Sequence, residues 1–442
     1  MNVNNQQQRP SFGEALRFWF KLGWISFGGT AGHIAIMHEY LVDRKKWISN
    51  SRFLHALNHC MILPGPEAQQ LATYVGWQLH GKKGGLAAGI LFVLPSMFIL
   101  LALSMMYVLY GNVPWIYAMF NGLKPAVVAI VILAMIRVGQ KALHTPLHYV
   151  LAAAAFVSIF WFNLSLLVII AGTIGIALLV RYLWPSLVEK DEHQEEAMAA
   201  EEQGYYLNKY TKSPAGGNVM LRLGKQIGVA LLLWVLPFAL FFWLAEDFRF
   251  WKGMVLFFTQ TAFVTVGGSY TVLPYVAQFS VGKLNWLSNM QMIDGFALAE
   301  TTPGPLIIVL SYVGFMAGYN HFGGSLWMGT LGLLTTTFYT FLPCFLFIFA
   351  GAPLIGKTQE NKSIAGVLGF VTAAVTGVIL NLTLFLGKDV LFPGGVTFAH
   401  LDYTALCWML LSLFLLIRYR LNVVYLIGMS LCFGGLHYLL TK

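Results

Sequence analysis

Two glutamates lie within apolar stretches of the chain and close to a Pro-Gly-Pro sequence. Glu67 directly follows Pro64–Pro66, and Glu300 lies three positions before Pro303–Pro305. Proline removes a backbone hydrogen-bond donor and its ring clashes with the preceding turn, so we expect a helix to break at both sequences. Carboxylates in membrane-like segments face the protein interior or a water-filled cavity. The glutamates are therefore candidate proton carriers or caps of new helix starts, and the sequence leaves both roles open.

Paired glycines form a second kind of interruption. Gly28-Gly29 and Gly267-Gly268 each interrupt an apolar stretch. A helix start exposes unpaired N–H groups and a partial positive charge, so it binds anions without a charged side chain, and glycine lets the backbone approach a ligand closely. Four such interruptions could surround one small tetrahedral anion. The alternative is that the glycine pairs are close-packing surfaces between membrane helices and the prolines are simple kinks.

Side chains near these interruptions would complete such a site. The candidate hydroxyl donors are Thr30, Ser269, Thr301 and Thr302, and the candidate countercharges are Lys21 and Lys124. His33 follows the first glycine pair and is expected to be a donor or a packing residue. His55 and His59 lie four positions apart, a spacing that two metal ligands can use, but no third ligand is suitably spaced. We therefore expect no metal and no cofactor.

The interruptions recur in two copies. A glycine pair, a Trp-x-Ser-Asn sequence and Pro-Gly-Pro repeat in the same order at a constant offset of 239 positions. Tyr-Val-Gly at 74 and 312 and a further glycine pair at 84 and 323 follow them. Five matches in order indicate a duplication. We expect two homologous helical repeats, over 1–183 and 223–442, joined by an acidic flexible linker over 184–222.

The elements that carry these motifs are expected to be membrane helices. Hydrophobic residues make up 58% of the chain and charged residues only 10%, whereas soluble domains usually carry about 25% charged residues. Apolar runs of roughly the 20 residues that a spanning helix needs cover 86–110, 113–136, 164–182, 227–245, 326–350 and 403–417. The sequence predicts an all-α polytopic membrane protein with nine to thirteen spans and with helices broken at the Pro-Gly-Pro and Gly-Gly motifs.

An extra apolar segment at 224–244 precedes the second repeat and has no counterpart before the first. One additional span would insert the second repeat upside down, and inverted repeats place a substrate site at their interface near the middle of the bilayer. The basic residues that fit one cytoplasmic side are Lys82, Lys83, Arg137, Lys141, Arg181 and Arg222. The cluster Asp43–Lys46 fits that side only if the preceding interrupted segment turns back. We therefore expect the repeats to be inverted.

The full sequences around these motifs resemble one known family. Leu63–Tyr74, Phe27–Gly29 with His33–Ala35, Val272–Val276 and Leu298–Pro305 are similar to the signatures of the chromate ion transporter family in its long two-domain form. The resemblance covers most of 12–442. Thr30 departs from it, because family members often have proline there. By motif position, the resemblance implies that substrate is bound at Gly28, Gly29, Pro64, Gly65, Pro66, Glu67, Gln70, Gly267, Gly268, Glu300, Thr301, Thr302, Pro303, Gly304 and Pro305.

The resemblance also implies chromate export across a bacterial inner membrane, with sulfate as a close mimic of the substrate. An inside-negative potential of 100 mV is worth ~2.3 kcal/mol per charge, so a dianion gains about 4.6 kcal/mol by leaving the cell. The expected partners are chromate or a sulfate-like oxyanion, the lipid bilayer and protons, with no nucleic acid. Uptake of sulfate or another oxyanion remains an alternative, driven by more than two co-transported positive charges. A membrane-embedded enzyme is not expected, because the loops outside the linker are too short for a soluble pocket.

Overall fold

The computed structural model of the chain describes residues 9–27, 29–111, 113–162, 164, 166–183, 204–208, 211, 219–244, 246–265, 269–358, 362–395 and 397–441. These residues form helices and turns, and the bridge found among them joins Ile48 to Leu207. Gly28, Gly267 and Gly268 lie outside the described residues, as do the acidic residues of the expected linker between 184 and 203.

The helices follow one another in two comparable series. The first series consists of α1 (Phe12–Ile25), α2 (Gly29–His38), the π-helical turn η1 (Glu39–Arg44), α3 (Asn50–Ile62), α4 (Glu67–Tyr110), α5 (Pro114–Ala142), α6 (Pro146–Phe160) and α7 (Leu166–Leu183). After α8 (Val219–Leu244), the second series consists of α9 (Phe248–Val264), α10 (Ser269–Ala277), the π-helical turn η4 (Gln278–Lys283), α11 (Asn289–Thr301), η5 (Leu306–Ile308), α12 (Val309–His321), α13 (Leu326–Thr358), α14 (Lys362–Leu391), η6 (Phe398–His400), α15 (Tyr403–Arg418) and α16 (Val423–Thr441).

Seven helices in the described part of the chain are long and apolar enough to span a membrane, namely α4, α5, α7, α8, α13, α14 and α16. Shorter apolar helices are α6, α15 and the stretch Leu306–His321. Five of the six predicted apolar runs fall in the long helices, and the sixth, 403–417, forms the shorter α15. The α4 segment contains two helices, because His80 and Gly81 leave helical geometry, with φ +60° at Gly81. The chain is a multi-pass membrane protein.

The two series share local backbone details as well as motifs. A π-helical turn precedes a residue in the left-handed region in both, at Lys46 and Asn285, each with φ 50°. The amides of Trp47 and Trp286 then donate to carbonyls six residues earlier, at 2.8 Å in both cases. A serine caps the next helix in each series, Ser49 for α3 and Ser288 for α11. The repeated sequence therefore folds along the same path twice.

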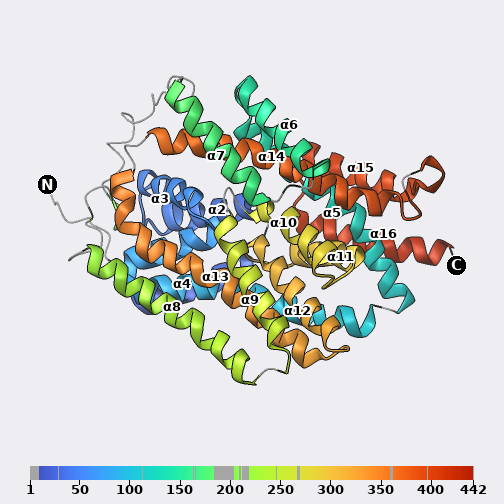
Figure 1. Cartoon of the computed structure of the whole chain (residues 1–442), viewed down its shortest axis with the longest axis horizontal. Coiled ribbons are helices and arrows are strands. Elements are labelled where there is room, and N and C mark those ends of the chain that lie inside the picture. Colours follow the sequence, from blue (N-terminus) through green and yellow to red (C-terminus); the bar gives the residue numbers. More distant parts are fainter. Residues whose placement is uncertain are drawn as a thin grey trace.

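The halves pack into one another instead of forming separate bodies. The later part of α4 and most of α5 belong to the same hydrophobic core as α9 to α14, and α5 also packs on α15 and α16. A second core joins α1 to α4 with Ile348 of α13. Figure 1 shows the first-half helices α3 and α4 beside α13. Helix α8 covers the outside of α9 and α13, where the Trp234 indole donates to Thr259 Oγ1 at 2.9 Å.

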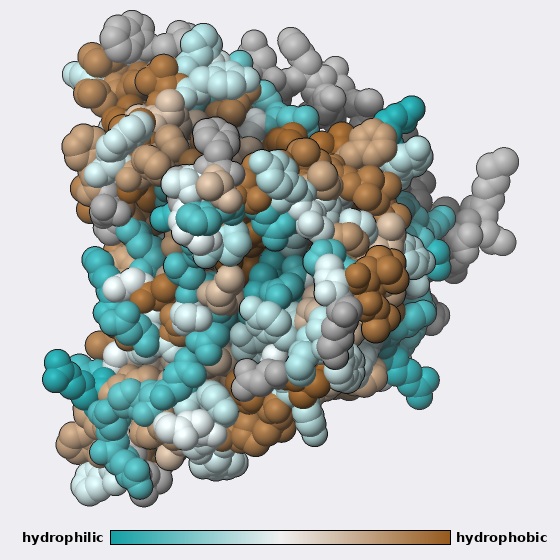
Figure 2. Space-filling model, turned by 90° about the vertical axis from the view of Figure 1, so that its right-hand side faces the viewer, coloured by the Kyte–Doolittle hydropathy of each residue, from teal (hydrophilic) through white to brown (hydrophobic). Residues whose placement is uncertain are grey.

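The surface is consistent with a lipid environment around much of the molecule. Large apolar side chains are exposed along α6, α7, α8, α15 and α16. Figure 2 looks at the end of the molecule on the right of Figure 1; hydrophilic residues lie across the middle and the lower left of this face, and hydrophobic patches lie at its upper left, right and bottom. Apolar helix surfaces left uncovered by protein are what hydrocarbon chains solvate.

Part of the expected linker contacts the first series. The Leu207 amide donates to the Trp47 carbonyl and the Ser49 amide donates to the Leu207 carbonyl, both at 2.9 Å, and the Leu207 side chain is buried. The Arg52 guanidinium also donates to the carbonyls of Asn208 and Thr211. These contacts attach residues 204–208 to the start of α3. The end of the expected linker is helical from Val219 onwards, where α8 begins.

Candidate functional site

The two Pro-Gly-Pro turns meet the opposite repeat in a reciprocal way. The Gly65 amide donates to the Thr265 carbonyl, and the Gly304 amide donates to the Ser26 carbonyl, each at 2.6 Å. Ser26 and Thr265 are the C-caps of α1 and α9, whose final carbonyls lack partners within their own helices. Each turn thus satisfies an end carbonyl of the other repeat. We call this region, formed by Ser26, Pro64–Pro66, Thr265 and Pro303–Pro305, the central junction.

Glycine is required at both turns of the central junction. Gly65 has φ +120° and Gly304 has φ +97°, a backbone region that L side chains rarely adopt. A Cβ on Gly65 would lie 2.7 Å from Cys344 Sγ of α13, and one on Gly304 would lie 2.5 Å from Ser96 Oγ of α4. The first turn therefore packs against α13 of the second repeat, and the second turn packs against α4 of the first repeat.

Helix ends converge beside the central junction. Helix α4 begins at Glu67, directly after the first turn, and the Glu67 carboxylate is buried in its first turn. Helix α2 begins at Gly29, and a Cβ there would lie 3.6 Å from the hydroxyl of Tyr270 in the first turn of α10. That hydroxyl donates to Glu300 Oε1 at 3.1 Å, near the end of α11. The starts of α2 and α10 and the end of α11 therefore lie together.

Several buried polar groups near these ends have no hydrogen bond of good geometry within the described residues. They are both ring nitrogens of His33, the Oε1 atoms of Gln69 and Gln70, and Ser26 Oγ. His33 is 1% exposed and its ring packs against Phe92. Buried polar groups normally have partners in protein or water. A polar ligand or an ordered water molecule could supply the missing hydrogen-bond partners of these groups, which lie beside helix starts with unpaired N–H groups.

Other predicted site residues form hydrogen bonds within their own turn or helix. The Gln70 amide nitrogen donates to the Pro64 carbonyl at 2.5 Å and so holds the first turn. The hydroxyls of Thr301 and Thr302 donate to Leu298 and Ala299 of their own helix, at 2.6 and 2.7 Å. Thr30 is half-buried in the first turn of α2, and Ser269 begins α10.

The two candidate countercharges have different surroundings. Lys21 is exposed on α1, with its ammonium 5.5 Å from the Tyr40 ring centroid. Lys124 is buried on α5, and its Nζ lies 3.5 Å from Asp294 Oδ1 of α11. Asp294 was not identified from the sequence as a candidate site residue. Its charge within the otherwise apolar run 292–299 is the signal that could have identified it.

The chain matches the family model for chromate transporters in two segments, residues 13–178 and 252–435. The chain belongs to the chromate transporter family. The two matched segments correspond to the long two-domain form, and α8 lies outside both. Members of this family are transporters rather than enzymes.

Individual chromate transporter relatives align over most of their length. This transporter is 29% identical to a chromate transport protein of Pseudomonas aeruginosa over 86% of this chain and 82% of the relative. It is 27% identical to a probable chromate transport protein of Synechococcus elongatus, over 86% and 85% of the two chains. The chromate transport protein of Cupriavidus metallidurans is 27% identical over 85% and 82%. No solved structure matches this chain.

Proposed function

We propose that this protein exports chromate across the bacterial inner membrane and that the central junction holds the anion. The observation that carries the proposal is the reciprocal insertion of each Pro-Gly-Pro turn into the other repeat. It gathers helix starts and unsatisfied polar groups at one buried place. Family membership and the names of the relatives supply the substrate, a tetrahedral dianion.

The proposed contacts are mostly backbone amides. The starts of α2, α4 and α10 present N–H groups and positive helix-dipole ends, and glycine permits close approach at both turns. The substrate-binding residues that we propose are those predicted from the motifs and from the side chains beside them, Gly28 to Thr30, His33, Pro64 to Glu67, Gln70, Gly267 to Ser269 and Glu300 to Pro305.

Two buried carboxylates beside a dianion site imply a role for protons. An ionised Glu67 or Glu300 would repel chromate across a low-dielectric interior, where like charges interact strongly. Protonation of either glutamate would relieve that repulsion. We therefore propose that export uses proton movement together with the membrane potential, with Glu67 and Glu300 as proton carriers.

An inverted relation between the repeats fits these contacts. Reciprocal contacts, in which each repeat donates to the same position of the other, are characteristic of two-fold symmetry. The additional helix α8 between the matched segments would place that axis in the plane of the membrane. We propose repeats over 1–183 and 223–442 connected through 184–222, with α8 as the extra leading helix.

Flux measurements in inverted membrane vesicles test this function. Energised inverted vesicles are positive inside, so an exporter should accumulate labelled chromate in them, and dissipating the potential should abolish the accumulation. Unlabelled sulfate should compete if the site reads only charge and shape. Sulfate entering right-side-out vesicles against the potential, with no chromate accumulation in inverted ones, would instead establish an uptake carrier.

A further inference from the structure

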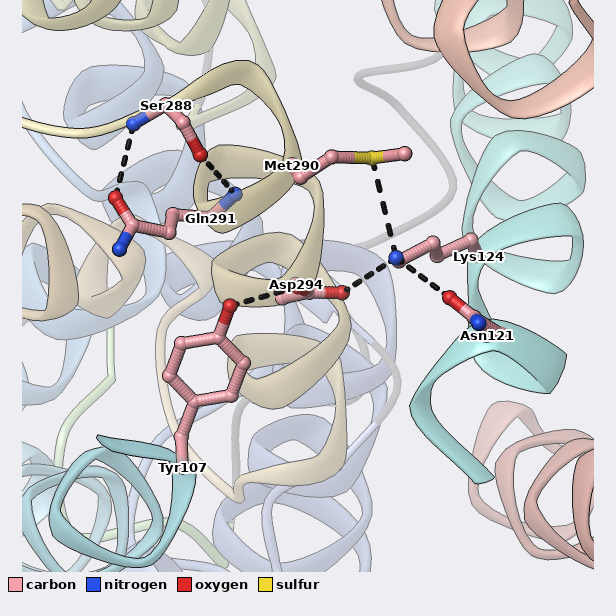
Figure 3. A network of polar contacts seen from close by, with 7 residues as sticks. All are labelled: Tyr107, Asn121, Lys124, Ser288, Met290, Gln291 and Asp294. Carbon is pink, nitrogen blue, oxygen red and sulfur yellow. Dashed lines mark hydrogen bonds and ion pairs between the residues drawn. The ribbon is translucent and has the colours of Figure 1, made fainter. Parts of the chain in front are cut away.

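A buried ion pair links the two repeats away from the Pro-Gly-Pro turns. Lys124 of α5 and Asp294 of α11 are 3.5 Å apart, with side-chain exposures of 5% and 7%. Figure 3 shows both side chains pointing toward each other between their helices. Among the described residues, Lys124 is the single lysine or arginine that is buried. Removing an ammonium from water is costly, so its presence at a repeat interface calls for a function.

The two charged groups are not in close hydrogen-bonding contact, and each has another partner. Asp294 Oδ2 accepts from the Tyr107 hydroxyl at 2.8 Å, and the Lys124 ammonium donates to Asn121 Oδ1 at 2.7 Å. Met290 Sδ lies 3.9 Å from the same nitrogen. The separation of 3.5 Å between the charges exceeds the ~2.8 Å of a charge-assisted hydrogen bond, and Asp294 Oδ1 has no hydrogen bond within the described residues. A pair built only for stability would be expected to close this gap.

The titratable groups around Asp294 come from three neighbouring helices. Helix α5 contributes Lys124 and, below its ammonium, the Tyr117 ring at 5.5 Å. Helix α4 contributes Tyr107, and α12 contributes Tyr312, whose ring centroid lies 6.0 Å from that of Tyr107. Within the described residues, α14, α16 and η5 also pack on α11 but bring no charged side chain into contact with the pair. Asp294 is thus the one carboxylate able to neutralise Lys124 here.

Helix α11 connects this pair to the central junction. Asp294 precedes Glu300 by six residues, which corresponds to about 9 Å of helix rise. Glu300 receives the Tyr270 hydroxyl beside the start of α10. A change of charge at Asp294 therefore acts on the same rigid helix that carries the second Pro-Gly-Pro turn.

We infer that Asp294 and Lys124 form a proton-controlled countercharge for the transported oxyanion. This inference rests on the proposed function. Ionised Asp294 neutralises Lys124 and keeps α5 and α11 together. When Asp294 takes up a proton, Lys124 is left with a neutral partner and becomes available to the tetrahedral anion. Anion binding and proton binding at Asp294 therefore favour one another, and the coupling is reciprocal.

Anion binding by the purified full-length protein at several pH values tests the inference. The wild-type affinity for chromate or sulfate should rise as pH falls, by up to about tenfold per pH unit for one linked proton. Asp294→Asn should bind more tightly than wild type at pH 8, because asparagine cannot neutralise Lys124. It should also lose the part of the slope that Asp294 supplies and keep the shallower part that the two glutamates supply. Lys124→Met should bind weakly at every pH, and the double variant Lys124→Met with Asp294→Asn should remain folded but bind weakly.

Matched variants separate this inference from its alternatives. Asp402→Asn makes the same substitution at the N-cap of α15, where asparagine still caps a helix, so it should keep the wild-type slope. Because chromate itself takes up a proton near neutral pH, each variant is compared with wild type in the same buffers. An unchanged slope in Asp294→Asn, or a slope abolished by Glu300→Gln alone, would overturn the inference. Absence of binding by the wild type at any pH would instead overturn the proposed function.

Discussion

Helices α3 and α11 are equivalent parts of the two repeats and carry different ionisable side chains. Each has 13 residues, follows a serine N-cap and ends at a Pro-Gly-Pro turn. Helix α3 carries Arg52, His55 and His59, whereas α11 has Gln291, Asp294 and Leu298 at the corresponding positions. Its second carboxylate, Glu300, corresponds to Met61. The duplicated backbone has thus been given one basic and one acidic half-helix.

This difference shows which features belong to the scaffold and which to the chemistry. The Pro-Gly-Pro turns, the π-helical turns and the serine caps of α3 and α11 occur in both repeats, where they flank the interruptions. The ionisable groups differ between the repeats, as the proposed function would require if one substrate between two equivalent halves needs both a place for its negative charge and a place for a proton. An oxyanion carrier with identical acidic halves would repel its own substrate.

The largest expected effect comes from disrupting the two Pro-Gly-Pro turns, which both repeats share. Gly65→Ala and Gly304→Ala each force a side chain into a left-handed backbone and against Cys344 or Ser96. Together the strain and overlap cost about 2–5 kcal/mol, which lowers the population of the assembled junction by roughly 30-fold or more. Chromate resistance should fall to the level of cells lacking the protein.

Gly172→Ala supplies the control, because that glycine lies in α7 with no atom within 4 Å of a Cβ. Immunodetection in membrane fractions checks that every variant is inserted. Full resistance with Gly65→Ala and Gly304→Ala would show that the two turns do not need their observed geometry.

The next largest effect concerns the buried glutamates beside the two Pro-Gly-Pro turns, which occupy different positions in the two repeats. Glu67→Gln replaces a buried carboxyl group at the start of α4, and Pro64→Ala removes one of the two prolines of the break before it. Both should abolish resistance while the protein still reaches the membrane. Glu300→Gln should lose less, by roughly 10-fold in flux, since its amide oxygen still accepts the Tyr270 hydroxyl. Equal flux in all three variants and wild type would remove these residues from transport.

A smaller effect follows from making α3 resemble α11. Arg52→Gln introduces the residue found at the equivalent position of α11 and removes the donors to Asn208 and Thr211. Bonds to a charged donor contribute about 1.5–3 kcal/mol, so residues 204–208 should detach more often. Limited proteolysis should cleave this segment at least several times faster than in the wild type, with Lys46→Gln as a control of equal charge loss. Unchanged cleavage would mean that the backbone hydrogen bonds to Lys46, Trp47 and Ser49 and the buried Leu207 side chain hold the segment without Arg52.

The smallest effect concerns the first helix of each repeat. Ser11 caps α1 through the Glu14 amide, and Asp247 caps α9 through the Phe250 amide. The hydrogen bond from Phe250, together with that of His321, lowers the pKa of Asp247 from its ordinary value. The cap of α9 therefore stabilises fully above the ordinary carboxyl pKa and is lost as pH falls through the lowered pKa, while the Ser11 cap stays constant.

Asp247→Ser should give α9 the pH-independent cap of α1. Thermal unfolding in detergent should show a loss of at most about 1 kcal/mol near neutral pH and a weaker decline of stability in acid than in the wild type. Ser11→Asp, the reverse change, should add an acid-sensitive contribution. A wild type and Asp247→Ser with parallel stability profiles would mean that the Asp247 charge does not contribute.

Much of the scaffold follows from the sequence, because its signals are local. Long apolar runs require spanning helices, and the Pro-Gly-Pro sequences end a helix, so α3 and α11 end before their turns, whereas the single prolines Pro95 and Pro125 lie inside α4 and α5. The repeat is likewise visible in aligned motifs. The partners of individual groups are not local. Nothing in the sequence near Lys124 indicates that Asp294, 170 positions later, is its counterion. The docking of Leu207 on α3 depends equally on tertiary packing.

The exchanged hydrogen bonds of the two turns have a consequence for biogenesis. The Gly65 amide is paired with a carbonyl that lies 200 positions further along the chain. At ribosomal speeds of 5–20 residues per second, that carbonyl is synthesised about 10–40 s after the turn itself. During this interval an unpaired amide within lipid costs several kcal/mol. The newly inserted first half must therefore remain hydrated or sheltered by the insertion machinery until α9 arrives.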